Sequence, residues 1–427
     1  MRSCMFSRIA LLVLVPTVAL AQRPVIEISG ANFRPMPLAV AAPLTQDEGA
    51  KTSSAEFDAA LAFDFAACGL FQVLDRKSFL ADPKEGVTAS TIQFQRWTDV
   101  GAESLVKTQL STDGASLRAD LRLFGVAAGR EELKVSESVP SKDARRLAHK
   151  LANAVYKHFT RETGPFETRL TFTRKSASGR DVYVSDWDGK NAQRITNGDV
   201  NVLPTLVPGG GVAFTSYRSK KPFLFISKGG EPTQLIAKGS MVTGAAFSPD
   251  GKRVAVSVSE GENAEIFLAN ADGSNITKLT DTKFFLNTSP TWSPDGKKIA
   301  FVSNRAGNPQ IYMMNADGSG AKRLTFQGNY NTTPSWSPRG DLIAFTARDE
   351  RNAFDLFTVN VENNKVARLT QDASGNEEPV FSPNGRLIMF TSTRGGGRGL
   401  YVMTFDGNNQ IALPMEKGDV TTPDWAN

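Results

Sequence analysis

The amino-acid sequence predicts a small α/β N-terminal domain followed by an all-β six-bladed β-propeller that the C-terminal strand closes. Three observations support this fold class. A Ser-Pro-x-Gly turn recurs at near-constant spacing in the second half of the chain, short alternating strands follow each copy, and the chain ends one strand into a further copy. The first part of the chain lacks the repeat and mixes helical with strand-like segments.

The recurring turn sets the length of the repeat. Proline presets φ at the second position of such a turn, and glycine takes its last corner. The prolines of the four clear copies are 45, 44 and 45 residues apart, at Pro249, Pro294, Pro338 and Pro383. Period-2 alternation gives three further short strands in each unit, and four strands in about 45 residues are typical of a propeller blade.

The two ends of this region complete one blade. The first unit has its second, third and fourth strands at 170–173, 181–185 and 194–196, but no first strand. Thr422-Pro423-Asp424-Trp425 matches the missing strand, so the ring is expected to close without an open sheet edge. The six predicted blades are counted from Leu170, Leu203, Gly244, Pro290, Pro334 and Pro379.

Residues 1–21 are predicted to be a signal peptide. Arg2 and Arg8 precede a short apolar run that begins at Ile9, and an Ala-x-Ala cleavage site ends at Ala21. The run is too short to span a bilayer, so we expect a soluble exported protein. Cys68 is then the one remaining cysteine, which excludes an internal disulfide and favours a buried small hydrophobic side chain.

Residues 34–162 are predicted to form the small α/β domain, and residues 166–427 the propeller. Strands are expected at 72–75, 104–108 and 117–123. A capped helix is expected to follow Thr52–Ser54 and run through Phe65, and an amphipathic helix is expected over residues 144–159.

The sequence predicts no catalytic residue, cofactor or metal site. Basic and acidic residues are interspersed at a formal net charge of +5, which gives no case for nucleic acid. His149 and His158 lie nine residues apart in one helix, on opposite faces, and are expected to be solvated. Asp188, Asp272 and Asp317 each precede a glycine, which favours turn geometry over a calcium loop.

One carboxylate pair remains as a candidate for chemistry. Glu377 and Glu378 are adjacent, and paired carboxylates serve acid–base catalysis in many enzymes. We expect them to lie on an exposed loop, as a solvated edge or a recognition surface.

The combination of a signal peptide, an α/β domain and Pro-x-Trp-Ser-Pro-Asp-Gly repeats resembles the TolB family, the periplasmic component of the Tol–Pal system. Val73–Arg76 and Phe94–Trp97 are further family-like segments. The resemblance covers nearly the whole chain after the signal peptide. It implies a non-catalytic, monomeric periplasmic adaptor that reaches membranes only through its partners. It also implies a role in outer-membrane integrity and in constriction at cell division.

The resemblance implies that an outer-membrane lipoprotein similar to Pal binds the ring face where loops lead into the innermost strands. Met241 stands where many family members have histidine, and methionine is an adaptable contact residue. The Pal-binding residues implied in this way are Met241, Thr243, Gly244, Asn287, Thr288, Thr332, Glu377, Glu378 and Thr421.

The resemblance also implies that residues 22–33 form an arm that binds the C-terminal domain of TolA. Val25, Ile26, Glu27 and Ile28 are suited to add a strand to a partner's sheet edge, and the alternative is that this segment pairs permanently within its own domain. We hypothesise an arm that is either docked or released. Two other classes stay open: an exported propeller enzyme related to glycan lyases or peptidases, and a free-standing ligand-binding propeller.

Overall fold

The structure, a computed structural model, describes residues 33–348, 350–371, 375–416 and 418–426. The predicted signal peptide lies outside these residues, as does the segment Val25–Ile28 of the predicted arm. Within the described ranges, no helix combines the length and the apolar character needed to cross a membrane.

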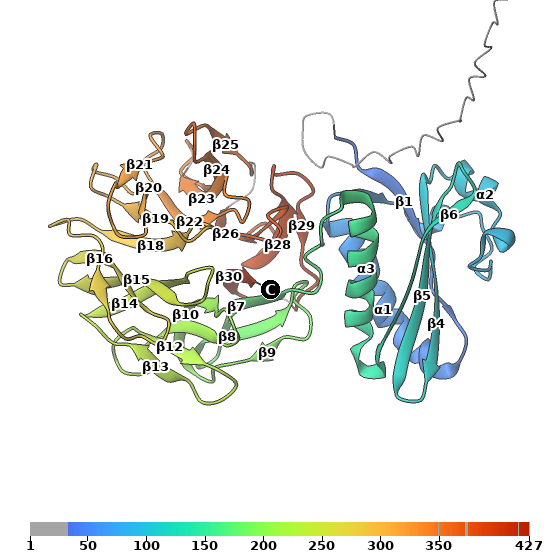
Figure 1. Cartoon of the computed structure of the whole chain (residues 1–427), viewed down its shortest axis with the longest axis horizontal. Helices are drawn as coiled ribbons and strands as arrows, with labels where there is room; N and C mark the ends of the chain where they lie inside the picture. The colour runs from blue at the N-terminus through green and yellow to red at the C-terminus, as the bar shows by residue number, and fades with distance from the viewer. Residues whose placement is uncertain (1–32, 349, 372–374, 417, 427) are drawn as a thin grey trace, which may run out of the picture.

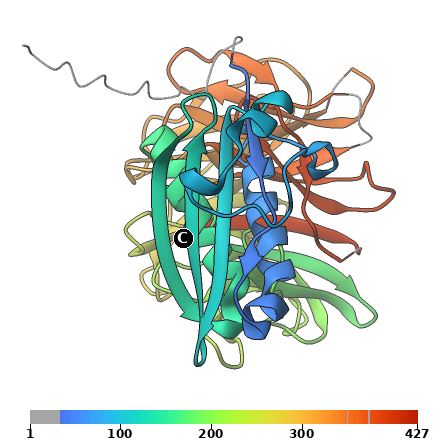
Figure 2. The ribbon, with the colours of Figure 1, turned by 90° about the vertical axis from the view of Figure 1, so that its right-hand side faces the viewer.

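In the described residues, the N-terminal domain is a six-stranded sheet with helices α1 and α3 on the face that looks toward the ring (Figure 1). The strand order is β3-β1-β4-β5-β6, and β2 pairs with β4. Figure 2 views this domain from outside, with the ring behind it. Its elements are β1 (Met36–Val40), β2 (Leu44–Thr45), α1 (Glu48–Ala67), β3 (Phe71–Val73), α2 (Phe94–Asp99), β4 (Ser104–Asp113), β5 (Ser116–Gly125), β6 (Arg130–Pro140), α3 (Ala144–Thr160) and the short 3₁₀ helices Arg76–Ser78, Ala89–Thr91 and Ser141–Asp143.

The amphipathic helix α3 is confirmed, but α1 begins earlier than predicted. Asp47 caps α1: its carboxylate accepts hydrogen bonds from the backbone N–H of Ala50 at 2.8 Å and from that of Thr112 in β4 at 2.8 Å. The expected start after Thr52–Ser54 is therefore wrong, because a contact with a distant strand selects the N-cap.

The rest of the described chain, from Arg169 onward, is an all-β, propeller-type domain. Four sheets have four antiparallel strands each, and a fifth joins β30-β7-β8-β9 to β10-β11-β12-β13 through a short parallel pairing of β8 with β10. The first half of these strands comprises β7 (Arg169–Ser176), β8 (Gly179–Asp186), β9 (Gln193–Arg194), β10 (Asp199–Leu206), β11 (Val212–Ser216), β12 (Phe223–Ser227), β13 (Thr233–Ile236), β14 (Met241–Phe247), β15 (Arg253–Glu260), β16 (Asn263–Asn270), β17 (Thr277–Lys278) and β18 (Asn287–Trp292). The second half comprises β19 (Lys298–Ser303), β20 (Gln310–Asn315), β21 (Lys322–Arg323), β22 (Asn331–Trp336), β23 (Leu342–Arg348), β24 (Phe354–Asn360), β25 (Val366–Arg368), β26 (Asn376–Phe381), β27 (Leu387–Ser392), β28 (Gly399–Thr404), β29 (Ile411–Ala412) and β30 (Val420–Ala426).

The last strand pairs with the first strand of this domain. β30 runs antiparallel to β7, with Val420 opposite Arg174 and Trp425 opposite Leu170. The C-terminal segment, which the sequence shows as the first strand of an unfinished repeat, therefore pairs with a strand from the other end of the domain.

The repeated turns have the geometry that their residues predict. Ser248 Oγ donates to the Asp250 carboxylate at 2.5 Å, and the Gly251 N–H donates to the Ser248 carbonyl at 2.8 Å with the glycine at φ 67°. Asp272 and Asp317 likewise accept backbone N–H groups two residues on, both at 2.9 Å, as turn residues do.

One hydrophobic core runs across the junction of the two domains. The ring of Trp187, from the turn after β8, lies 5.3 Å from Phe63 of α1, 5.4 Å from Phe166 and 5.9 Å from Trp425 of β30. Cys68 is buried at the edge of this core, as predicted, and burial raises the pKa of its thiol to about 12. The shared core fixes α1 and α3 against the ring.

The expectation of solvated histidines is wrong for His149, whose side chain is 3 % exposed, and the side chain of His158 is also largely covered, at 12 % exposed. It lies between α1 and the turn after β8, beside the carboxylates of Asp64 and Asp188. Asp188 bonds the Lys190 N–H at 3.0 Å, as a turn residue should, but it is also fully buried. Sequence spacing places His149 on one helix face without revealing that the ring covers that face.

Candidate functional site

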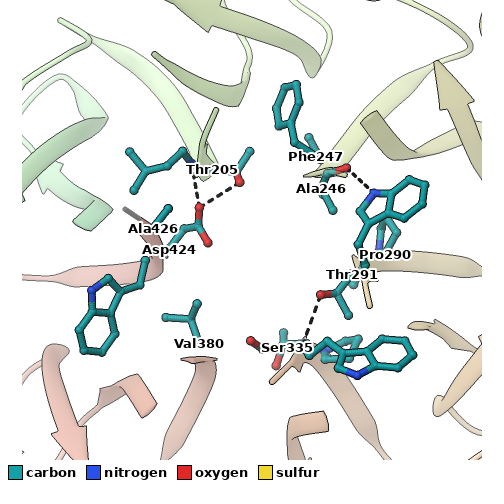
Figure 3. A pocket seen from close by; sticks show the side chains of 18 of the residues that line it. Thr205, Ala246, Phe247, Pro290, Thr291, Ser335, Val380, Asp424 and Ala426 are labelled. Carbon is teal, nitrogen blue, oxygen red and sulfur yellow. Dashed lines mark hydrogen bonds between the residues drawn. The ribbon is translucent and has the colours of Figure 1, made fainter. Parts of the chain in front are cut away.

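Six strands of the described chain line a central cavity of about 500 Å³. These innermost strands are β10, β14, β18, β22, β26 and β30 (Figure 3). We call the face at which loops lead into them the loop face, and the face that carries the Ser-Pro-x-Gly turns the turn face. The N-terminal domain contacts the turn face, because Glu162 bonds Arg386 and Asn409 bonds the end of α1.

Each innermost strand has a β-bulge near the loop face, and one residue of every bulge has positive φ. Five of the six are not glycine, and the β-branched Thr333 and Thr422 rarely adopt this conformation. A strained backbone repeated at one place marks a candidate site. The residues are Leu203 (φ 50°), Gly244 (φ 60°), Ser289 (φ 53°), Thr333 (φ 48°), Glu378 (φ 60°) and Thr422 (φ 52°).

The residues that the resemblance nominated for partner binding gather around these bulges. Met241 begins β14, and Asn287 begins β18. Two further nominated residues, Gly244 and Glu378, are themselves the bulged residues of their strands. The other nominated residues are the last paired residues before a bulge: Thr243, Thr288, Thr332, Glu377 and Thr421. The structure thus brings the nominated set together around one mouth of the cavity.

Two nominated residues are buried and have no surface to offer a partner. Asn287 is 0 % exposed and donates to Glu265 of the preceding sheet at 2.8 Å. Asn331 donates to Gln310 in the same way, also at 2.8 Å. The corresponding positions of β10 and β26 carry Asn201 and Asn376. Asn287 therefore links neighbouring sheets through its side chain, and we call asparagines at this position asparagine clamps. This burial corrects the expectation that Asn287 contacts a partner protein.

Thr421 is the second nominated residue without free surface. It is buried, and its hydroxyl accepts from Arg180 at 2.8 Å and lies 3.0 Å from the hydroxyl of Thr173 in β7. These bonds hold β30 to β7 and β8, so Thr421 secures the C-terminal strand and does not form part of the exposed face.

The expectation of an exposed loop at Glu377 and Glu378 is wrong, because both lie in β26. The Glu378 carboxylate accepts the backbone N–H of Thr422 at 2.6 Å and the hydroxyl of Thr391 at 2.8 Å. Burial raises its pKa, and the charge of Glu377 adds to the rise. Glu378 therefore bridges β26 to the C-terminal strand and is not a free acid–base group.

A second carboxylate bridges the other side of the C-terminal strand. Asp424 of β30 accepts the Leu206 N–H at 2.7 Å and the Thr205 hydroxyl at 3.0 Å, as Figure 3 shows. Burial raises its pKa as well. In two other innermost strands, the hydroxyls of Thr291 and Ser335 accept the backbone N–H of the next strand instead. The cavity is therefore lined by groups that hold strands together.

The loop face also carries a set of exposed apolar side chains that the sequence reading missed. Phe284 is 86 % exposed and Phe326 is 63 % exposed, both in loops that lead into innermost strands. A run of exposed apolar side chains such as Phe284–Leu286 marks a candidate interaction site. We call the set the apolar rim: Val200, Leu203, Tyr217, Phe284, Phe285, Leu286, Phe326 and Tyr330. The run Phe284–Leu286 directly before a strand was the available sequence signal.

Arginine side chains support the aromatic residues of the rim. The guanidinium of Arg323 lies 5.1 Å from the ring centre of Phe326, and that of Arg348 lies 5.1 Å from the ring centre of Tyr330. Cation–π contacts hold such rings in place without covering their outer faces. The rim is thus an apolar surface with positive charge beside it, which suits a protein partner that offers apolar and acidic groups.

Comparisons with known proteins agree with this two-part architecture. A family model described as the TolB amino-terminal domain matches residues 24–132, and one described as the TolB beta propeller domain matches residues 156–427. A Tol-Pal system protein TolB of Myxococcus xanthus (strain DK1622) is 64% identical over 420 residues, which cover 98% of this chain and 97% of the relative.

A Tol-Pal system protein TolB of Anaeromyxobacter dehalogenans (strain 2CP-1) is 46% identical over 418 residues, which cover 96% of this chain and 95% of the relative. The crystal structure of TolB from Acinetobacter baumannii superimposes with a TM-score of 0.78 at 23% identity, over 92% of this chain and 97% of that one. At that identity the superposition shows a shared fold. These curated relatives carry the name of a system component and not of an enzyme.

Proposed function

This chain belongs to the TolB family of Tol-Pal system proteins, and from that premise we propose that it is a non-catalytic periplasmic adaptor. In this proposal the loop face binds a Pal-like outer-membrane lipoprotein, and residues 22–33 bind the C-terminal domain of TolA. The adaptor supports outer-membrane integrity and constriction during cell division.

The apolar rim is the observation that carries the Pal proposal. Its members lie at the ends of strands and in loops on the loop face, where the nominated residues also lie, and they leave large aromatic surfaces in water. Thr288 lies among them, one residue before the bulged Ser289. Aromatic side chains near the centre of an interface contribute much of its binding energy. The partner is expected to bury an area on the order of 1,600 Å² in total.

The experiment is a calorimetric titration of the chain without residues 1–21 with the soluble domain of the Pal-like lipoprotein from the same organism. Thr288→Arg should abolish binding, because it inserts a long charged side chain beside the rim. Thr98→Arg is the matched control, since Thr98 is an exposed residue of α2 in the N-terminal domain. Saturable binding by the wild type and by Thr98→Arg, with none by folded Thr288→Arg, is the expected result. A folded wild type that does not bind would overturn the proposal.

The proposed TolA contact rests on the family and on the position of the arm. The described chain starts at Phe33, just before β1, so residues 22–32 lead directly into the N-terminal domain. Val25–Ile28 would add to a sheet edge of TolA through main-chain hydrogen bonds. Deleting residues 22–33 should remove TolA binding and leave Pal binding intact. Normal TolA binding by the deletion variant would contradict the assignment.

We also propose that the ring has six blades and that β30 closes it. Contacts between innermost strands support this, because they form a cycle: β10, β14, β18, β22, β26, β30 and back to β10. Removing residues 420–427 would expose strand edges on β7 and break this cycle, so we expect an aggregated protein. Removing Asn427 alone is the control and should leave a folded monomer. A folded, monomeric protein without residues 420–427 would refute closure by β30.

A further inference from the structure

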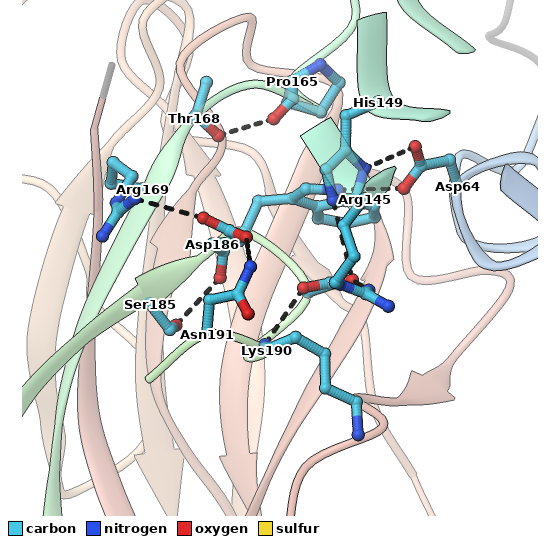
Figure 4. Close-up of polar contacts among 12 residues, drawn as sticks. Asp64, Arg145, His149, Pro165, Thr168, Arg169, Ser185, Asp186, Lys190 and Asn191 are labelled. Carbon is cyan, nitrogen blue, oxygen red and sulfur yellow. Dashed lines mark hydrogen bonds and ion pairs between the residues drawn. The ribbon is translucent and has the colours of Figure 1, made fainter. Parts of the chain in front are cut away.

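We propose that His149, Asp186 and Asp188 form a binding site for a first-row divalent cation such as Zn²⁺, at the seam between the N-terminal domain and the ring. One ring nitrogen of His149 and one oxygen of each carboxylate all lie within 4.8 Å of one another. Helix α3 supplies the histidine, and the end of β8 with its turn supplies the two carboxylates (Figure 4). This site lies on the turn face and is separate from the proposed docking surface.

The imidazole of His149 is oriented as metal-binding histidines are. Its Nδ1 lies 2.7 Å from Asp64 Oδ2, and the other oxygen of Asp64 accepts the indole N–H of Trp187 at 3.0 Å. A carboxylate that accepts from Nδ1 keeps the proton there and leaves the lone pair of Nε2 for a cation. Asp64 and His149 therefore already have the geometry of the carboxylate and histidine in a carboxylate–histidine–metal arrangement.

Among the described residues, the second nitrogen of this imidazole has no hydrogen-bond partner, although the residue is only 2 % exposed. Its nearest acidic oxygen is Asp188 Oδ2 at 3.8 Å, too far for a hydrogen bond. An unpaired buried nitrogen costs free energy. A cation bound between Nε2 and the carboxylates would satisfy it, and this orphaned atom is the independent sign of a ligand.

The two carboxylates are held in place by other groups and keep lone pairs free. Asp186 accepts from Arg169 at 3.1 Å through one oxygen and from Asn191 at 2.7 Å through the other. Asp188 Oδ1 accepts the Lys190 N–H. Each carboxylate oxygen offers two lone pairs. One imidazole and two carboxylates, completed by water, suit zinc and neighbouring first-row cations better than Ca²⁺.

Arg145 is the competitor for this site. Its guanidinium contacts Asp188 Oδ2, the same oxygen that lies nearest to His149. A cation must therefore displace Arg145 or share the oxygen with it. Access runs past Asp186, whose side chain is 20% exposed, while His149 and Asp188 lie deeper. A bound cation would tie α3 to the turn after β8 and so fix the N-terminal domain against the ring.

The test uses the full chain without residues 1–21, stripped with a chelator and titrated with Zn²⁺ by calorimetry. We expect one saturable site, and Co²⁺ should give the visible absorption of a tetrahedral N/O centre. His149→Gln and Asp186→Asn should each weaken Zn²⁺ binding at least tenfold. His158→Gln is the matched control, because His158 lies on the same helix but outside the cluster, and it should bind as the wild type does.

A second readout separates a bound cation from a merely structural cluster. Zn²⁺ should raise the thermal unfolding temperature of the wild type and of His158→Gln, but not that of Asp186→Asn, which keeps the size of the side chain and an amide oxygen as acceptor and should fold. The imidazole ¹⁵N signal of Nε2 in His149 should shift on titration. Absence of saturable Zn²⁺ binding by folded wild type, or an affinity equal to that of the wild type in His149→Gln or Asp186→Asn, would overturn the proposal.

Discussion

The loop face and the turn face of the ring are built by the same strands, yet they differ in chemistry. On the turn face, ion pairs and hydrogen bonds join the ring to the N-terminal domain: Glu162 bonds Arg386 at 2.8 Å, and Asn409 bonds the Ala66 carbonyl at 2.8 Å. On the loop face, aromatic side chains such as Phe284 are left in water. The difference teaches that one repeated unit can carry different chemistry at the two ends of its strands.

The reason lies in the connections. The Ser-Pro-x-Gly turns of the turn face are short and saturated by their own hydrogen bonds, such as the Ser293 hydroxyl to Asp295 at 2.6 Å. They present a regular surface on which another domain can pack. The loops of the loop face vary in length and sequence from sheet to sheet, so they can carry side chains that serve a partner.

The largest expected effect is on stability at the turn face. In the metal-free protein, Arg145→Ala leaves the fully buried Asp188 carboxylate without its arginine partner, and breaking one side of a buried ion pair costs about 3–5 kcal/mol. We expect a large drop in the thermal unfolding temperature. Arg146→Ala is the matched control, because Arg146 is exposed, and it should change stability by less than about 0.5 kcal/mol. Equal effects of the two substitutions would contradict the anchoring role of this face.

A smaller effect on stability is expected at the sheet junctions beneath the loop face. Asn331→Ala removes one of the two donors to Gln310, the other being the Thr325 hydroxyl, and it also removes the donor to the Gln327 carbonyl. Each lost hydrogen bond costs about 0.5–1.5 kcal/mol. Denaturant unfolding should show the loss. Asn329→Ala, two residues earlier and exposed, should not change the midpoint. An unchanged midpoint in Asn331→Ala would mean that the asparagine clamps do not hold neighbouring sheets together.

Binding and stability should separate at the apolar rim. Phe284→Ala removes a side chain that packs against little of its own protein, so the unfolding temperature should stay the same. Affinity for the Pal-like domain should fall by about 1–2 kcal/mol, roughly 5- to 30-fold. Leu80→Ala, at an exposed apolar residue of the N-terminal domain, should leave affinity unchanged. Equal losses of affinity in both variants would place the docking surface elsewhere.

The smallest effect concerns pH and the carboxylate of Asp424 in the ring centre. Burial raises its pKa above the unfolded value, so its ionisation disfavours the folded state as pH rises through the folded pKa. Asp424→Asn should therefore stabilise the protein at neutral pH, by about 1 kcal/mol or less, while keeping an acceptor for the Leu206 N–H. The gain should vanish at a pH below the unfolded pKa. The measurement is thermal unfolding of Asp424→Asn and the wild type at both pH values. A stabilisation by Asp424→Asn that increases toward acidic pH would contradict the predicted direction.

The sequence by itself determined the features that depend on neighbouring residues. Turn chemistry and period-2 alternation predicted the repeat, and the amphipathic pattern predicted α3 (Ala144–Thr160). The unfinished last repeat predicted that the final strand needs a partner from the front of the domain, and Trp425 does lie opposite Leu170. These signals depend on neighbouring or regularly spaced residues, so they can be recognised in the sequence without knowledge of the fold.

Tertiary structure alone decided which side chains meet. The sequence predicts a solvated His149, but the turn after β8 covers this residue in the structure. The sequence also predicts a loop carboxylate at Glu378, but this carboxylate accepts the Thr422 N–H of β30. Phe284 and Phe326 lie in different loops, and they share the loop face only because the sheets surround a common centre. Burial and proximity between distant segments depend on how whole elements pack, and no sequence spacing encodes that packing.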